Sequence, residues 1–599
     1  MLNSPPIWLK AVIVGVLIAL AFLAFSNAFR NDFVYDDIRL IKENENLKGF
    51  TSVRLAFTAD YYTSSLDPVT LGYYRPLAIL LNLLDFKLWG FEPAGYHLTN
   101  TLLHAANTIL VFLLIWKLAL KKRLLLAGIT AALFALHPIH TESVAFISGR
   151  VDPLCTLFVL AALNIYLFNT NHAKLPSPGR AFAASILFMF ALFSKEMAVS
   201  LPFLFFLLLL YQLQSTHGST LLRAARTAVL GTLWPVFTLI IYFGLRIAVL
   251  GRITSQHFES ESTGILLKFL AMNRALRWNI RYLLFPPSHL NLEPVIYFRS
   301  NLRSHIILFL FNVLFFLIVI WLWRRSRLAS VALLWVFITL MPVSGLISLE
   351  NFVAERFLYL PSIGMCLALG VLISALCTAS GSDSLTARHY ALRAVGITAL
   401  IGVLSVYASI SLKKNALWKD EVTLWSNQLH IQPACAKAAY NLGYHYHKDG
   451  SFQDAEIYYI KAIKAAPNHY KALNNLGLLF QRQKRYTSAE SVFIRAIKME
   501  PKRVWAHYNL GNLYIEKRNL PKGIVVLKRA LKLDPEHYQA RANMAMALIF
   551  LGHPDEAITH FERILEKHPQ ERRALNGLAL AKRKLKEKPG VYVPIPEDP

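Results

Sequence analysis

The chain has 599 residues, 55% of them hydrophobic, and a formal net charge of +27. In a soluble protein this charge would suggest a nucleic-acid partner. Here much of it lies in short loops between apolar runs, where positive charge orients a membrane protein, so we expect no nucleic-acid binding. The cysteines are too few and too scattered for a disulfide framework or a zinc site: Cys155, Cys366, Cys377 and Cys435.

Residues 1–411 are a succession of apolar runs, whereas residues 415–599 are polar and helical in pattern. Runs of about 20 apolar residues match the thickness of a bilayer core. The first run is about long enough to span the bilayer, and Lys10 is the only charged residue at its N-terminal end. Both features favour an uncleaved anchor over a signal peptide. We predict about eleven spans, near residues 8–29, 97–116, 124–137, 153–170, 181–194, 198–213, 227–247, 304–323, 328–343, 356–378 and 389–411.

Lysine and arginine clusters fall in alternate loops between these spans, which predicts that those loops and the N-terminus are cytoplasmic. Residues 415–599 are then extracytoplasmic. The membrane would be the cytoplasmic membrane in a bacterium, or the endoplasmic reticulum membrane in a eukaryote. The segment 266–285 is apolar but carries three arginines, which suits an interfacial or re-entrant helix. The outer face gathers the remaining loops: 30–96, 137–152, 194–197, 248–303 and 344–356.

Two adjacent carboxylates, Asp36 and Asp37, follow directly on the first span. Acids this close to lipid are costly unless they are solvated, paired or used. One interpretation is a loop that merely caps the span. The other is a functional site, which is favoured because the other outer loops bring further polar groups to the same side.

The second span begins with His97 and continues through Asn100, His104 and Asn107. These spacings put all four side chains on one helical face. Such a stripe should face the bundle interior or a water-filled cavity. Hydrogen bonding between helices is the structural alternative.

The loop 137–152 carries His137, His140 and Glu142, which could suggest a metal site. The spacing matches no strong zinc motif and a third ligand is unidentified, so a divalent metal stays an open alternative.

Arg150, at the end of the same loop, could hold a phosphate, a group that a guanidinium suits well. Lys195 could bind an anion or pair with its neighbour Glu196. For each of these charges the alternative is a structural ion pair near the membrane interface.

Prolines recur every 34 residues from Pro433 to Pro569, and Asn-Leu-Gly recurs in step from residue 441. Small residues and then bulky ones follow at the same period. This order is the signature of tetratricopeptide (TPR) repeats. We predict four full repeats over 436–569, a half-repeat at 415–433, a capping helix at 571–587 and a disordered tail over 588–599. The predicted fold class is all-α, with a membrane domain over 1–411 followed by an α-solenoid over 415–587.

Several short motifs together resemble one family. They are the Asp-Asp loop after the first span, Tyr73-Tyr74-Arg75-Pro76-Leu77, His97-Leu98-Thr99-Asn100, the run from His137 to Ser143, Ser194-Lys195-Glu196, the run from Glu355 to Pro361, and repeats entered through the run from Trp418 to Trp425. In this order, over nearly the whole chain, they are similar to the transmembrane-and-TPR protein O-mannosyltransferases and their prokaryotic relatives. The region 250–303 is shorter than in the eukaryotic members, which favours a bacterial member.

The resemblance implies a GT-C membrane fold and transfer of a sugar from a polyprenyl-phosphate donor to protein Ser/Thr hydroxyls outside the cytoplasm. Asp36 and Asp37 match the family's catalytic acidic pair, and one of them would act as base in an inverting displacement. Arg75, Arg150, Lys195 and Arg356 are the phosphate candidates. The remaining donor-site candidates, some of which could shape the sugar pocket, are His97, His140, Glu142, Glu196 and Glu355.

The TPR groove would hold an extended acceptor polypeptide. The polyprenyl-phosphate sugar would be the donor substrate, and no cofactor is predicted apart from the divalent metal left open above. Three alternatives remain: a transferase acting on a lipid or glycan, a non-catalytic membrane scaffold whose repeats recruit envelope proteins, and a transporter. A transporter would place charges deep within its spans, whereas here they cluster in loops.

Overall fold

The computed structural model describes residues 6–49, 51–62, 72–119, 123–167, 175–216, 219–253, 265–292, 302–344, 353–378 and 387–587. Throughout these residues the regular structure is helical, as the sequence predicts. The chain divides into two compact units, Met1–Leu424 and Trp425–Pro599.

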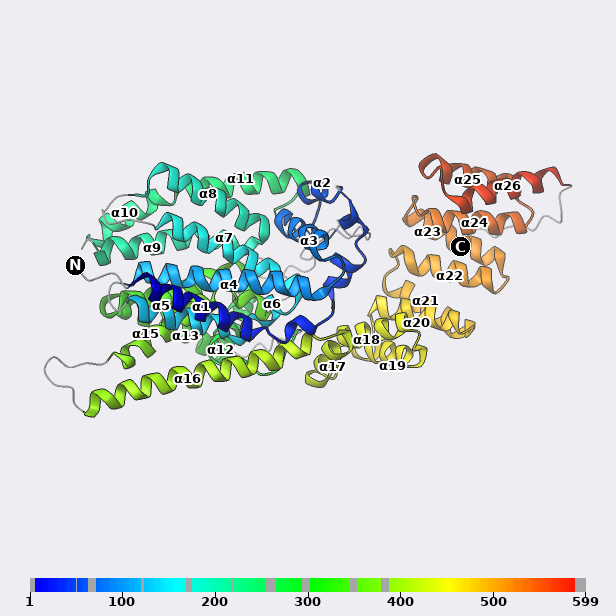
Figure 1. The fold of residues 1–599 in the computed structure, drawn as a ribbon. Coiled ribbons are helices and arrows are strands. Elements are labelled where there is room, and N and C mark those ends of the chain that lie inside the picture. Colours follow the sequence, from blue (N-terminus) through cyan, green and yellow to red (C-terminus); the bar gives the residue numbers. More distant parts are fainter. Residues whose placement is uncertain are drawn as a thin grey trace. The chain divides into compact units, whose positions relative to one another are not determined.

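The first unit is a bundle of helices (Figure 1). α4 packs against α5 and α7, α7 against α8, and α15 against α5, α14 and α16. The long helices are α1 (Ile7–Ala24), α4 (Pro93–Leu118), α5 (Arg123–Leu136), α7 (Val151–Tyr166), α8 (Pro178–Ser194), α9 (Leu201–Thr216), α10 (Leu221–Gly231), α11 (Leu233–Leu250), α12 (Ile265–Leu284), α13 (Leu302–Arg325), α14 (Arg327–Leu340), α15 (Ser362–Cys377) and α16 (Ala387–Asn415).

Each predicted span overlaps one or two of these helices. Among the described residues, six helices are long and apolar enough to cross a membrane, or seven if α5 and the bent segment after it form one span. α8, α14 and α15 are apolar but shorter. The unit therefore belongs to a multi-pass membrane protein, while the number of eleven spans stays a prediction.

Among the described residues, several loops between the long helices contain shorter helices. α2 (Thr51–Thr58) and α3 (Pro76–Trp89) precede α4, and α6 (Thr141–Val144) follows α5. Short 3₁₀ helices carry five of the eleven predicted site residues: Pro138–His140, Ile147–Arg150, Glu196–Ser200 and Glu355–Leu358.

The loop 137–152 folds back on itself at Gly149. A Cβ there would lie 2.2 Å from the Glu142 carbonyl oxygen, so only glycine allows this approach.

The second unit consists of antiparallel helix pairs (Figure 1). A short helix, α17 (Glu421–Ile431), leads into it. The pairs are α18 (Ala436–Asp449) with α19 (Phe452–Ala465), α20 (Tyr470–Arg482) with α21 (Tyr486–Met499), α22 (Val504–Glu516) with α23 (Leu520–Leu533), and α24 (Tyr538–Phe550) with α25 (Pro554–Lys567); α26 (Arg572–Lys586) follows.

The 34-residue period of the sequence is realised in a recurring contact between the two helices of a pair. Gly443 lies against the Tyr459 ring and Gly477 against the Phe493 ring, where a Cβ would come within 2.7 and 2.5 Å. Both rings are fully buried. Each small residue therefore lets its bulky partner fill the space between two helices, as the TPR prediction requires. The predicted tail, 588–599, lies outside the described residues.

Candidate functional site

The two adjacent aspartates have different surroundings. Asp37 is fully buried, and its carboxylate accepts hydrogen bonds from the Val34 N–H at 3.1 Å, the Ser148 N–H at 2.7 Å and the Ser148 hydroxyl at 2.5 Å. Burial raises the pKa of Asp37 to about 7, and the Ser148 and Val34 hydrogen bonds oppose this rise. Asp37 thus fastens the acidic loop, Asn31–Asp37, to the loop that holds Ser148.

Asp36 is only partly buried. Its Oδ2 accepts a hydrogen bond from the Tyr62 hydroxyl at 3.1 Å. Burial, and next the negative charge of Asp36, raise the pKa of Tyr62 well above its usual value, so this phenol stays a donor. The preceding residue, Tyr35, has a φ of +55°, a left-handed conformation that bulky residues rarely adopt. Strained backbone of this kind concentrates at functional sites.

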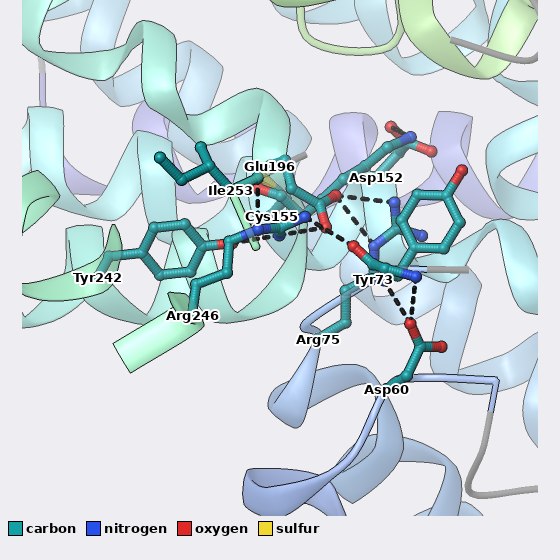
Figure 2. Close-up of polar contacts among 11 residues, drawn as sticks. Asp60, Tyr73, Arg75, Asp152, Cys155, Glu196, Tyr242, Arg246 and Ile253 are labelled. Carbon is teal, nitrogen blue, oxygen red and sulfur yellow. Dashed lines mark hydrogen bonds and ion pairs between the residues drawn. The ribbon is translucent and has the colours of Figure 1, made fainter. Parts of the chain in front are cut away.

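Arg75 lies in a group of polar contacts drawn in Figure 2. Its Nε and Nη2 donate to one oxygen of Glu196, at 3.1 and 2.8 Å. The other Glu196 oxygen pairs with Arg246 at 3.2 Å, so one carboxylate holds two guanidinium groups. Burial lowers the pKa of Arg75, but the charge and hydrogen bond of Glu196, together with Tyr73 and Tyr62, outweigh it and the net shift is upward.

Lys195 does not pair with its neighbour Glu196. It pairs with Asp152, at 2.6 Å. This long-range pair replaces the Lys195–Glu196 pair that the sequence left open.

Arg356 pairs with the buried carboxylate of Glu142 at 2.5 Å and keeps 28% of its side chain exposed. Lys195 and Arg356 both lie over the Phe357 ring, with Lys195 Nζ 5.4 Å and Arg356 Cζ 5.3 Å from the ring centroid. Asp152 also interacts electrostatically with Arg356 and Arg75.

These contacts bring Asp36, Arg75, Glu142, Lys195, Glu196 and Arg356 into one region. Arg75 and Asp36 both act electrostatically on Tyr62, and Arg356 interacts with Tyr35. The region holds three carboxylates, of which Asp36 and Glu196 are partly buried, beside three cations. Such an arrangement can accept a proton at Asp36 and stabilise negative charge nearby. We call these six residues the candidate site.

The other predicted residues lie in closed networks. Arg150 is fully buried and donates to Asp85 at 2.6 Å and to Asn82, Tyr96 and Ile147. Four of the five donors of a guanidinium are thus engaged within the chain. In this arrangement Arg150 offers no surface to a phosphate.

Glu355 pairs with Lys414, and both side chains are buried. Burial raises the pKa of Glu355 to about 7, and Lys414 opposes the rise. Since Lys414 also donates to the Pro138 carbonyl at 3.3 Å, this pair fastens the end of α16 to two loops.

The predicted polar stripe of α4 faces the bundle interior. Asn100 donates to the Val144 carbonyl at 3.1 Å and Asn107 donates to the Pro153 carbonyl at 2.9 Å. The His97 Nε2 atom lies 3.2 Å from the Asn31 carbonyl oxygen, so His97 holds the first residue of the acidic loop against α4.

His140 is buried against the Ser362 hydroxyl at 2.8 Å, whereas Glu142 faces Arg356. His137 contacts the Leu283 carbonyl at 3.2 Å, so the three residues considered as metal ligands have different partners. Within the described ranges, no group of three or more His, Cys, Asp or Glu side chains is arranged to hold a metal ion.

The sequence reading missed Tyr62, Arg246 and Lys414. Arg246 is the one charged residue of the apolar helix α11, and Lys414 lies near the end of α16. A charge in an apolar helix of a membrane protein is a functional or structural signal by itself, and could have singled out Arg246. Tyr62 has no comparable signal.

Comparison with known proteins agrees with the repeats and with the resemblance. Models of the tetratricopeptide repeat match residues 435–502, 474–538 and 522–581. A protein O-mannosyl-transferase of Caenorhabditis elegans, F38B6.6, is 28% identical over 475 residues, covering 76% of this chain and 63% of that protein. Human TMTC4, of the same description, is 27% identical and covers 76% of this chain and 66% of that protein.

The chain is homologous to proteins named protein O-mannosyl-transferase. The resemblance found in the motifs is thus confirmed. The chain spans about half to two thirds of the length of these relatives. Among solved structures, the crystal structure of MamA protein is similar to part of the chain, with 22% identity and a TM-score of 0.24, covering 25% of this chain and 82% of that chain.

Proposed function

We propose that this protein is a membrane glycosyltransferase of GT-C type that moves a hexose, mannose by analogy with its relatives, from a polyprenyl-phosphate donor to protein Ser/Thr hydroxyls. The observation that carries this proposal is the convergence of Asp36 with Arg75, Lys195 and Arg356. The names of the homologues support it.

In the proposed reaction Asp36 accepts the proton of the acceptor hydroxyl as its oxygen attacks the anomeric carbon. The new carbon–oxygen bond forms while the bond to the phosphate oxygen breaks, and a single displacement inverts the sugar. Asp36 is the better base because Asp37 is buried and already accepts three hydrogen bonds. Asp37 then positions the loop.

Negative charge develops on the leaving phosphate, and fixed cations stabilise it. Arg356 and Arg75 are the best placed for this task, since each retains some exposed surface, 28% and 12% of the side chain. Lys195 is more deeply buried and adds positive charge near the Phe357 ring.

An apolar groove supports a lipid-linked donor. It has a volume of about 360 Å³ and is lined by apolar residues of α12, α13, α14 and α15, with Asn312 as the one polar residue. Val336 and Met365 of the groove belong to the same hydrophobic cluster as Phe357. An isoprenoid chain in the groove would therefore end close to Lys195 and Arg356, where its phosphate is needed.

We also propose that the active face is extracytoplasmic and that the TPR repeats engage the acceptor polypeptide. The alternation of lysine and arginine clusters between loops supports this orientation.

The test is sugar transfer by the purified protein in lipid nanodiscs, supplied with polyprenyl-phosphate mannose and Ser/Thr peptides and read by mass spectrometry. We expect Asp36→Asn to lower the rate by about 10²–10⁴-fold, because a general base contributes that much. Asp32→Asn, an exposed acid in the same loop, is the matched control.

An Asp36→Asn protein that folds normally and transfers at the wild-type rate would remove Asp36 from the mechanism. Absence of transfer by the wild type to peptides, lipids and glycans alike would leave the scaffold interpretation.

A further inference from the structure

The segment Lys414–Glu421 joins α16 to the repeat region, and the function proposed above gives it no role. We call it the junction segment. It contacts the acidic loop at several points although the two are more than 380 residues apart in sequence. The Asn31 amide donates to the Asn415 carbonyl at 2.9 Å, and the Asp32 N–H donates to the Lys419 carbonyl at 2.8 Å.

The most informative contact is at Tyr35. Its N–H donates to the Glu421 carboxylate. Hydrogen bonds to a charged acceptor are among the stronger ones. A left-handed φ in a bulky residue persists only where the surroundings enforce it. Glu421 supplies such a constraint, and because Tyr35 directly precedes Asp36, its backbone conformation sets the direction in which the Asp36 side chain leaves the loop.

An aromatic stack also holds Tyr35, this time through its side chain. The Tyr35 ring stacks on Phe146 with a centroid distance of 6.0 Å, and Phe146 stacks on Trp418 at 4.8 Å with an interplanar angle of 12°. Trp418 is 1% exposed. Phe146 is two residues before Ser148, which binds Asp37, so the stack ties three distant segments into one support.

We propose that two residues of the junction segment, Glu421 and Trp418, are positioning residues of the transferase site, which hold Tyr35 in its left-handed conformation and thereby aim Asp36. The inference rests on the function proposed above and deepens it. It assigns a role to the Trp-Lys-Asp-Glu entry of the repeats, which otherwise would only begin a helix.

The test compares Glu421→Ala and Glu421→Gln in the full-length protein. Glutamine keeps an oxygen that can accept the Tyr35 N–H, whereas alanine does not. Trp418→Ala and Trp418→Phe form a second pair, in which phenylalanine keeps a ring against Phe146. Lys419→Ala is the matched control, because its side chain is 67% exposed and its backbone carbonyl is unchanged. Two quantities are measured: the kinetics of transfer, and amide deuterium uptake over residues 31–37.

We expect Glu421→Ala to lower kcat at least about tenfold while KM for donor and peptide changes less than about twofold, because misplacing a reacting group costs rate more than binding. Deuterium uptake at Tyr35 should rise in the same variant. Glu421→Gln and Lys419→Ala should remain close to the wild type.

The proposal is overturned if Glu421→Ala matches Lys419→Ala in kcat, whatever the deuterium uptake. It is also overturned if Glu421→Ala and Glu421→Gln lower kcat equally and neither variant changes the deuterium uptake over residues 31–37. If the wild type transfers no sugar, the uptake measurement still decides whether Glu421 holds Tyr35, so failure of the proposed function is distinguished from failure of this inference.

Discussion

Two sets of ion pairs in the first unit differ in how far water reaches them. Arg150–Asp85 and Lys414–Glu355 have at most 1% of any side chain exposed. Arg75–Glu196 has 12% and 28% exposed, and the arginine of Arg356–Glu142 has 28% exposed. A fully buried pair must satisfy its charges within the protein and cannot exchange partners without great cost. The buried pairs therefore hold the helices and loops together, and the partly exposed pairs are the ones that the phosphate of the proposed donor would join.

The largest expected effect on stability comes from breaking a buried pair. Arg150→Met leaves the Asp85 carboxylate without its charge partner, which should lower the free energy of unfolding by about 3–5 kcal/mol. Chemical denaturation in detergent measures this change. The double variant Arg150→Met/Asp85→Leu should recover most of it, and a double variant as unstable as the single one would contradict the interpretation of a charge penalty.

A smaller effect on stability, but a large one on activity, is expected at a partly exposed pair. Arg75→Gln leaves Glu196 paired with Arg246, so the protein should fold with little loss of stability. The transfer rate should fall by about 10²–10³-fold, the usual cost of removing one group that stabilises developing charge. A loss of transfer rate accompanied by a large loss of folding free energy would instead give Arg75 a structural role.

The pH dependence of stability tests the burial of Asp37. Its pKa is about 7 in the folded protein, against an ordinary 3.8. As the pH rises, the unfolded chain therefore loses this proton at a lower pH than the folded protein. The free energy of unfolding is then highest below pH 3.8 and decreases as the pH rises toward 7. Thermal unfolding of Asp37→Asn and the wild type should diverge by about 1 kcal/mol per pH unit across this interval. Parallel pH profiles would show that Asp37 keeps its ordinary pKa.

The smallest effect is expected where both partners are exposed. Lys567 and Glu536, in the repeats, form a pair at 2.6 Å with 61% and 56% of the side chains exposed. Lys567→Ala should change the free energy of unfolding by less than about 1 kcal/mol. A change as large as that of Arg150→Met would show that burial of an ion pair does not determine its contribution to stability.

The repeats were predictable because each contact joins residues at a fixed spacing. Gly477 and Phe493, for example, lie on neighbouring helices of one repeat, and their period is visible in the sequence. The polar stripe of α4 was predictable for the same reason, since a helical face is a local property.

The pairing of charges was not predictable. Lys195 pairs with Asp152, 43 residues away, and not with the adjacent Glu196. Arg150 reaches Asp85, 65 residues away, in a buried network. Such choices follow from how the helices pack, and neither composition nor spacing contains them. For the same reason the sequence could name Asp36 and Asp37 together but could not assign them different surroundings.

The apolar groove between α12, α13, α14 and α15 has a consequence for how the reaction would be measured. A donor that enters from the lipid diffuses in two dimensions, and its effective concentration is its mole fraction in the membrane. Adding inert lipid at constant total donor should then slow the reaction by surface dilution, even though nothing in the aqueous phase has changed. Substitutions in the groove would alter this dependence on lipid content before they altered the chemistry at Asp36.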